Sequence, residues 1–122
     1  MRYDDYANKL FDAKCIELAY IISTPYISSS YDKVVDMGGQ NLYKVHVLST
    51  NSYHISFNTK LNPEVDFFAI LFKKKMAWYI IPNVHLSHMV RLKMTRRRLK
   101  MTRRMRPAKY SAFLSNWNFK II

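Results

Sequence analysis

The residues in this sequence that are best suited to chemistry are arginines and lysines in a tandem repeat. Residues 91–97 (RLKMTRR) are followed directly by an identical copy at residues 98–104. Together with Arg106, the stretch 91–106 carries nine bases in sixteen positions. Guanidinium and ammonium groups at this density favour phosphate as a ligand, so the repeat predicts contact with nucleic acid.

The apolar residues of this repeat do not form a helical face. On a helix, Leu92 and Leu99 would lie on one side and three methionines on the opposite side. We therefore expect residues 91–106 to form an arginine-rich arm that becomes ordered on nucleic acid. RNA is favoured over DNA because arginine-rich segments that fold on binding are common in RNA recognition. A solvated loop left by a duplication is one alternative that stays open. A segment that binds calmodulin or an anionic membrane is a second, although both partners favour an apolar stripe that this stretch lacks.

The charge is unevenly divided along the chain. The 122 residues include 20 Lys and Arg against 8 Asp and Glu, a net charge of +12. All eight acids lie in residues 1–66, whereas residues 67–122 hold fourteen bases and no acid. The second half is therefore the predicted partner surface. The predicted nucleic-acid-binding residues are Lys73, Lys74, Lys75, Arg91, Lys93, Arg96, Arg97, Arg98, Lys100, Arg103, Arg104, Arg106 and Lys109.

The amino-acid composition limits the class of protein and the cellular compartment that we expect. A single cysteine, Cys15, cannot form an intramolecular disulfide, which favours an intracellular, reducing compartment. The longest apolar run, residues 67–72, is too short to span a membrane. No cleavable targeting signal is visible at the N-terminus, and an organelle matrix stays open as a location.

The hydrophobic pattern predicts one α/β domain over residues 1–122. We expect a mixed central β-sheet flanked by an N-terminal and a C-terminal helix, with the basic arm inserted before the last helix. In the first helix, Tyr6, Leu10, Ala13 and Ile16 form the expected apolar stripe. The predicted elements are a helix over 5–19, strands at 20–23, 31–36, 42–48, 53–57, 65–72 and 76–81, and a helix over 109–117.

The strand pair at 31–36 and 42–48, joined by a Gly-Gly turn, resembles the core of the PD-(D/E)xK nuclease superfamily. It is most similar to the small homing-endonuclease and resolvase-like members. The resemblance continues through residues 65–70, 78–82 and 109–117. It implies a helix followed by strands that carry a metal-binding Asp and a Glu/Gln-x-Lys motif.

Most of the catalytic positions that this resemblance implies are changed in this chain. Asp32 stands at the metal-binding aspartate, but His46 occupies the Glu/Gln position and Leu48 the lysine position. Lys9 stands where the first helix usually offers a glutamate. One carboxylate cannot hold Mg²⁺ well, and leucine cannot stabilise an oxyanion, so we expect no metal and no catalysis here. A rearranged site that uses Asp32, Asp36, His46 or His54 stays open.

The sequence thus predicts a degenerate nuclease fold that binds nucleic acid without a cofactor. The leading hypothesis is an RNA-binding structural component of a ribonucleoprotein, with an organellar (mitochondrial-type) ribosome as the first candidate. Other proteins of that particle are further candidate partners, and no membrane contact is expected. The alternative is an active homing-endonuclease-like enzyme that cuts DNA with Mg²⁺. A third hypothesis is an adaptor whose basic arm meets an acidic protein.

Overall fold

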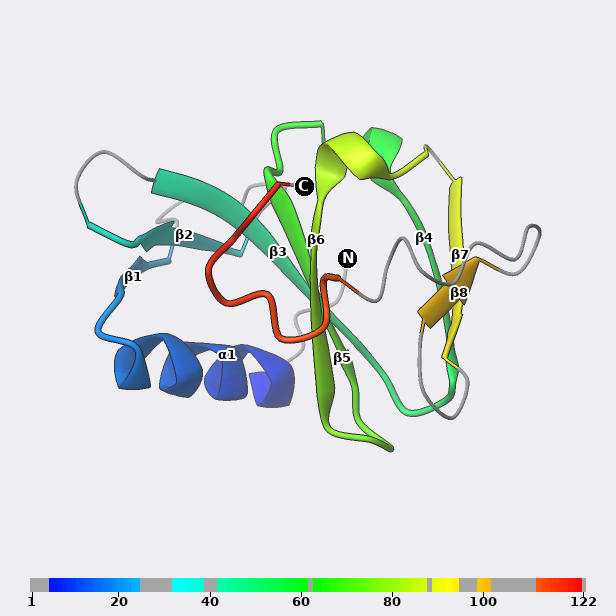
Figure 1. Ribbon diagram of the computed structural model, residues 1–122, viewed down its shortest axis with the longest axis horizontal. Helices are drawn as coiled ribbons and strands as arrows, with labels where there is room; N and C mark the ends of the chain where they lie inside the picture. Colours follow the sequence, from blue (N-terminus) through cyan, green and yellow to red (C-terminus); the bar gives the residue numbers. More distant parts are fainter. Residues whose placement is uncertain are drawn as a thin grey trace.

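The computed structural model describes residues 5–24, 32–38, 42–61, 63–87, 89–94, 99–101 and 112–121. From the first helix to the strand that ends at Pro82, its elements follow the predicted order (Figure 1), and two strands that were not predicted come after them. The long helix is α1 (Asp5–Glu17), and the short 3-10 helices are η1 (Thr59–Leu61) and η2 (Asn83–His85). The strands are β1 (Ile21–Ser23), β2 (Lys33–Asp36), β3 (Leu42–Thr50), β4 (His54–Asn58), β5 (Phe67–Phe72), β6 (Ala77–Pro82), β7 (Met89–Met94) and β8 (Leu99–Met101).

The strands form two sheets. The first has five strands in the order β1-β2-β3-β5-β6, and it is mixed because β3 and β5 run parallel while the other neighbours are antiparallel. The second has three antiparallel strands in the order β4-β7-β8. The predicted α/β class with a mixed central sheet is confirmed. None of the described helices is long and apolar enough to cross a membrane.

Strand β5 separates two hydrophobic cores. Every residue of β5 is buried, as expected for a central strand. Phe67, Ala69 and Leu71 belong to a core shared with α1, whereas the alternate residues belong to a core shared with β7. Alternate residues of a strand point to opposite faces of its sheet. The helix α1 therefore covers one face of the first sheet, and the second sheet covers the other face (Figure 1).

The apolar stripe predicted for the first helix is wrong, although its residue range is close. The buried face of α1 consists of Ala7, Phe11 and Cys15. Tyr6 is 52% exposed and Ile16 is 70% exposed. The helix is rotated because the Phe11 ring packs against two tryptophans, with ring centroids 5.8 Å and 5.6 Å away.

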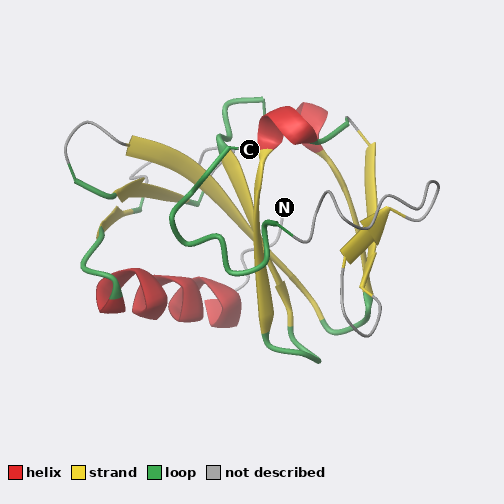
Figure 2. Ribbon diagram, viewed as in Figure 1, coloured by secondary structure: helices red, strands yellow, loops and turns green. Residues whose placement is uncertain are grey.

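The predicted C-terminal helix is also wrong where the chain is described. Residues 112–121 form turns along the edge of β6 and appear as loop in Figure 2. The N–H of Ile80 donates to the carbonyl of Phe113 at 3.0 Å, and the N–H of Ser115 donates to the carbonyl of Trp78 at 2.8 Å. Pairing with the free edge of β6 satisfies these backbone groups, and a positive φ of 52° at Ser115 and Phe119 is incompatible with a helix.

Candidate functional site

Asp32, the residue directly before β2, forms hydrogen bonds with the middle of β3. Its side-chain Oδ2 accepts a hydrogen bond from the N–H of Val47 at 2.7 Å. The Nδ1 atom of His46 lies 3.0 Å from the same oxygen. The N–H of Asp32 also donates to the carbonyl of Val45 at 2.9 Å. The carboxylate that the sequence assigned to a metal site is thus engaged in holding two strands together.

His46 and Leu48 lie on the face of β3 that points toward the second sheet. The imidazole of His46 is 4% exposed and meets the ring of Phe68 edge-on, with centroids 5.8 Å apart. Leu48 packs against the core between the sheets. The resemblance noted in the sequence implies a carboxylate at the position of His46 and a lysine at the position of Leu48, and this chain carries an imidazole and an alkyl side chain there. This face offers little to a divalent cation.

The other residues considered for a rearranged site lie elsewhere. Lys9 is exposed on α1, which covers the opposite face of the sheet. Asp36 is about 13 Å along the strand from Asp32 at about 3.3 Å per residue, and it accepts a hydrogen bond from Gly38. His54 belongs to the second sheet. In the part of the chain that the structure describes, no three His, Cys, Asp or Glu side chains are grouped so that they could hold a metal ion.

A buried lysine under α1 was missed by the sequence reasoning. Lys33 is 3% exposed, and its Nζ lies 3.0 Å from Asp12 Oδ2 and 3.1 Å from Thr24 Oγ1. The signal was its alternation with Val35, which puts both side chains on the helix-covered face of β2. Nearby, burial and the Asp12 charge raise the pKa of the Cys15 thiol from 9.0 to about 12, although the Lys33 charge lowers it. This cluster is therefore structural.

The basic repeat is folded into the second sheet where it is described. The exposed and buried residues of β7 alternate strictly: Arg91 and Lys93 are exposed, whereas Val90, Leu92 and Met94 are buried. The expectation of an arm without an apolar side is therefore wrong for residues 91–94. A strand needs a period of two, and the sequence reasoning tested only the period of a helix.

The second copy of the repeat supplies the neighbouring strand. Within β8, Lys100 is the register partner of Lys93. On the other side of β7, the register partners of Lys93 and Arg91 are His54 and Ser56 of β4. The outer face of the β4–β7–β8 sheet thus combines basic and polar positions. The predicted contacts Arg96, Arg97, Arg98, Arg103, Arg104, Arg106 and Lys109 lie outside the described residues.

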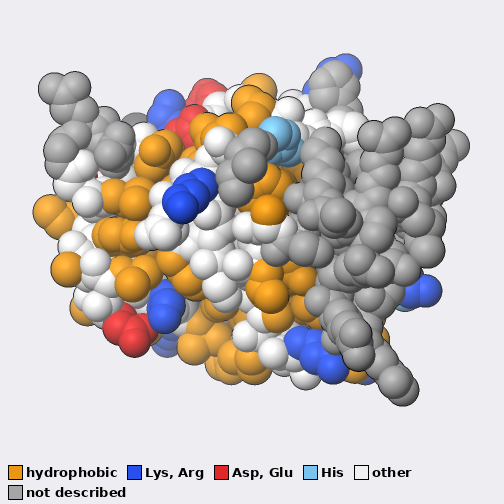
Figure 3. All heavy atoms as spheres, in the orientation of Figure 1, with side chains coloured by type: hydrophobic (Ala, Val, Ile, Leu, Met, Phe, Trp, Pro, Cys, Tyr) orange, Lys and Arg blue, Asp and Glu red, His pale blue; other side chains and the backbone are white. Residues whose placement is uncertain are grey.

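The lysine turn between β5 and β6 lies at the same end of the molecule as the start of β4. The Nζ of Lys74 stands 5.1 Å from the centroid of the Tyr53 ring, and the carbonyl of Tyr53 accepts a hydrogen bond from Met94 at 2.7 Å. The Nζ of Lys73 stands 5.3 Å from the centroid of the Tyr6 ring, and Lys75 is exposed. In Figure 3 basic side chains stand at this turn. Through Tyr53, Lys74 thus lies close to the Met94 end of β7.

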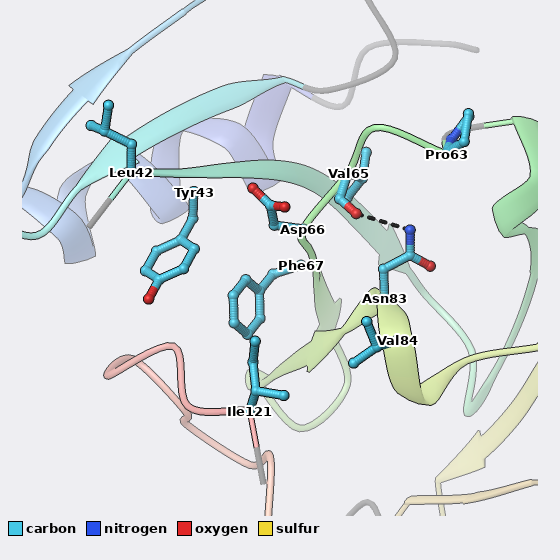
Figure 4. A pocket seen from close by; sticks show the side chains of 9 residues that line it. All are labelled: Leu42, Tyr43, Pro63, Val65, Asp66, Phe67, Asn83, Val84 and Ile121. Atoms are coloured by element: carbon cyan, nitrogen blue, oxygen red, sulfur yellow. Dashed lines mark hydrogen bonds between the residues drawn. The ribbon is translucent and has the colours of Figure 1, made fainter. Parts of the chain in front are cut away.

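A pocket with a volume of about 470 Å³ opens at one end of the first sheet, where β3 and β5 begin. Leu42, Val84 and Ile121 stand at its rim, and Asp66 and Asn83 supply polar atoms (Figure 4). Both polar side chains are engaged: Asp66 Oδ2 accepts from the N–H of Lys44 at 2.8 Å, and Asn83 donates to the carbonyl of Val65. None of the positions considered for catalysis lines this pocket.

Comparison with known proteins agrees with the architecture. A search of solved structures matches the bacterial homing endonuclease I-Ssp6803I with a TM-score of 0.70 and 20% sequence identity. The match covers 93% of this chain and 85% of the endonuclease chain. No protein-family model and no curated protein sequence matches this chain. At this identity the likeness establishes the fold, which is that of a small nuclease-like α/β domain.

Proposed function

We propose that this chain is a PD-(D/E)xK-type nuclease fold that binds nucleic acid and does not cut it. The observation that carries the proposal is the environment of Asp32. Its Oδ2 is occupied by the N–H of Val47 and faced by His46, while Leu48 fills the place of the expected lysine. Phosphodiester hydrolysis with Mg²⁺ needs oxygen ligands for the metal and a cation for the developing charge. The proposal accordingly includes no metal cofactor.

The basic half of the chain supports the binding part of the proposal. Residues 67–122 contain fourteen bases and no acid. Because one side of β7 is buried, Arg91 and Lys93 are held on its exposed side. Neutralising phosphates with such side chains releases counterions and makes binding strongly dependent on salt. The earlier preference for RNA rested on an arm that only nucleic acid would order. Because residues 91–94 are ordered by the core, that argument no longer separates RNA from DNA.

A more specific version of this proposal gives the protein a structural role in a ribonucleoprotein, such as an organellar ribosome. It is tested by crosslinking the protein in its own cells and sequencing the attached nucleic acid. Enrichment of one structured RNA would support the role. Enrichment of DNA would contradict it and leave the broader proposal standing.

An Mg²⁺-dependent DNA endonuclease is the second candidate, because the solved structure that matches this fold is a homing endonuclease. A cleavage assay separates the candidates. The purified chain is incubated with plasmid DNA and with RNA in Mg²⁺ or Mn²⁺, while binding is followed in parallel. We expect a complex and intact nucleic acid. Cleavage that disappears in the Asp32→Ala variant would establish the endonuclease, and the absence of any complex would refute the binding proposal.

A further inference from the structure

We propose that the outer face of the β4–β7–β8 sheet is a docking surface for the phosphate backbone of double-stranded DNA, centred on Lys93. This inference rests on the proposed nucleic-acid binding and specifies where and how it occurs. It concerns a face of the molecule distinct from the positions around Asp32. Those positions lie on the first sheet and point into the core between the sheets.

The first argument is that the core fixes the direction of the bases. Val90, Leu92 and Met94 are buried on the inner side of β7, so Arg91 and Lys93 are held on the outer side. Two residues along a strand span about 7 Å, so these two charges stand in a row with a fixed spacing. A preordered row of cations loses less conformational freedom on binding than a flexible arm would.

The second argument comes from the register of the duplicated segments. Residues 92–94 and 99–101 are copies of Leu-Lys-Met, and they pair antiparallel with Lys93 opposite Lys100. The strands β4, β7 and β8 contain no acidic residue. The exposed Arg91 and Lys93 therefore have no carboxylate within their own sheet, which favours an anionic partner.

The third argument is that a further base lies near the Lys93 end of the second sheet. The ammonium of Lys74 stands over the ring of Tyr53, which directly precedes β4. The next residue, His54, is the register partner of Lys93. The lysine turn therefore adds positive charge near this end of the sheet, which favours a long anionic partner such as a phosphate backbone.

The fourth argument concerns what this face lacks. The outward positions of β4 and β7 are His54, Ser56, Asn58, Met89, Arg91 and Lys93, and none of them is Phe, Tyr or Trp. Proteins that bind single strands rely on bases stacking on such rings. Phosphate contacts, in contrast, carry no sequence information. The major groove of B-form DNA admits a two-stranded β-ribbon, whereas the major groove of duplex RNA is too deep and narrow for side chains to read.

The test compares two double variants of the full-length chain that lose the same charge. Arg91→Gln/Lys93→Gln alters the docking surface, and Lys44→Gln/Lys120→Gln alters exposed lysines outside the second sheet. Binding to short DNA duplexes of unrelated sequence is followed by fluorescence anisotropy from about 50 to about 200 mM salt. Each lost phosphate contact should lower the slope of log K against log salt by about 0.9, so we expect a decrease of about 1.8 for the first variant. The control variant should keep the slope of the unaltered protein.

The outcomes separate this inference from the proposed function. Equal weakening by the two variants would place the contact elsewhere and overturn the docking surface, while binding itself would stand. No binding by the unaltered protein would refute both. Tighter binding to single-stranded DNA, to single-stranded RNA or to duplex RNA than to duplex DNA would overturn the assignment of the partner. The reciprocal swap Arg91→Lys/Lys93→Arg keeps both charges, so it should keep the slope and show that charge rather than fold is responsible.

Discussion

Asp32 provides the sharpest distinction between a vestigial and a working nuclease site. The structure predicts that this carboxylate stabilises the fold and does not bind Mg²⁺. Replacement by alanine leaves the buried N–H of Val47 without its acceptor and removes the anion beside His46. A hydrogen bond to a charged group contributes about 1.5–3 kcal/mol, so Asp32→Ala should destabilise the protein by about that amount. Asp32→Asn keeps an acceptor oxygen and should cost less.

The effect of Mg²⁺ on thermal unfolding tests the other half of this prediction. A site that is filled at about 100 times its Kd would add about 2.7 kcal/mol to the stability of the folded state. For a domain of this size, that corresponds to a rise in Tm of about 10 °C, at about 4 °C per kcal/mol. We expect no rise beyond that produced by a sodium salt of matched ionic strength. Differential scanning calorimetry with and without chelator measures it.

Two results would refute this reasoning about Asp32. The first is a magnesium-dependent rise in Tm of the expected size that is lost in Asp32→Asn, because it would show a metal ligand at this position. The second is an Asp32→Ala variant with unchanged Tm, because it would show that the bond to Val47 contributes nothing. Nucleic-acid binding should be the same in the folded variants, since Asp32 is on the sheet opposite the basic face.

Three further predictions concern the core beneath α1. Asp12→Asn should lower the free energy of unfolding by about 3–5 kcal/mol, because it leaves the buried ammonium of Lys33 without its anionic partner. Lys33→Met should cost less, because the Asp12 side chain is 35% exposed and can be hydrated. Urea unfolding measures both variants, and the reverse order of stabilities would contradict the argument. Cys15 should resist alkylation near pH 8 until the protein is unfolded, because its pKa of about 12 keeps it a thiol; rapid labelling of the folded protein would contradict this. Trp117→Ala should cost about 3–5 kcal/mol by removing a ring packed against Phe11 and Trp78, and an unchanged unfolding midpoint would contradict it.

Local patterns predicted the first sheet well. The strand pair around the Gly-Gly turn has the expected antiparallel pairing, with Val34 opposite Lys44, and β5 is buried on both faces as its apolar run indicated. These features depend on the period of two and on turn residues, which are local properties of the sequence. The parallel pairing of β3 with β5 joins segments that no local pattern relates.

The errors share a physical cause, which is that tertiary contacts override local periodicity. Residues 112–117 have helical spacing, but the unpaired edge of β6 offers hydrogen bonds that a helix would forgo. The burial of Lys33 was not predicted, because its partner Asp12 is 21 positions away in the sequence. The resemblance singled out the positions of Asp32 and His46 but did not predict that the two side chains are in contact. That contact is seen only in the structure.

The duplicated segment explains why a highly basic stretch could join a folded sheet. Leu-Lys-Met is apolar, basic and apolar, so it is symmetric about its lysine. When two copies pair antiparallel with Lys93 opposite Lys100, apolar positions fall opposite apolar positions, as Leu92 with Met101. A slip of one residue would place a lysine on the core face, which strongly disfavours other registers. A duplication of one amphipathic strand thus supplies its own partner strand.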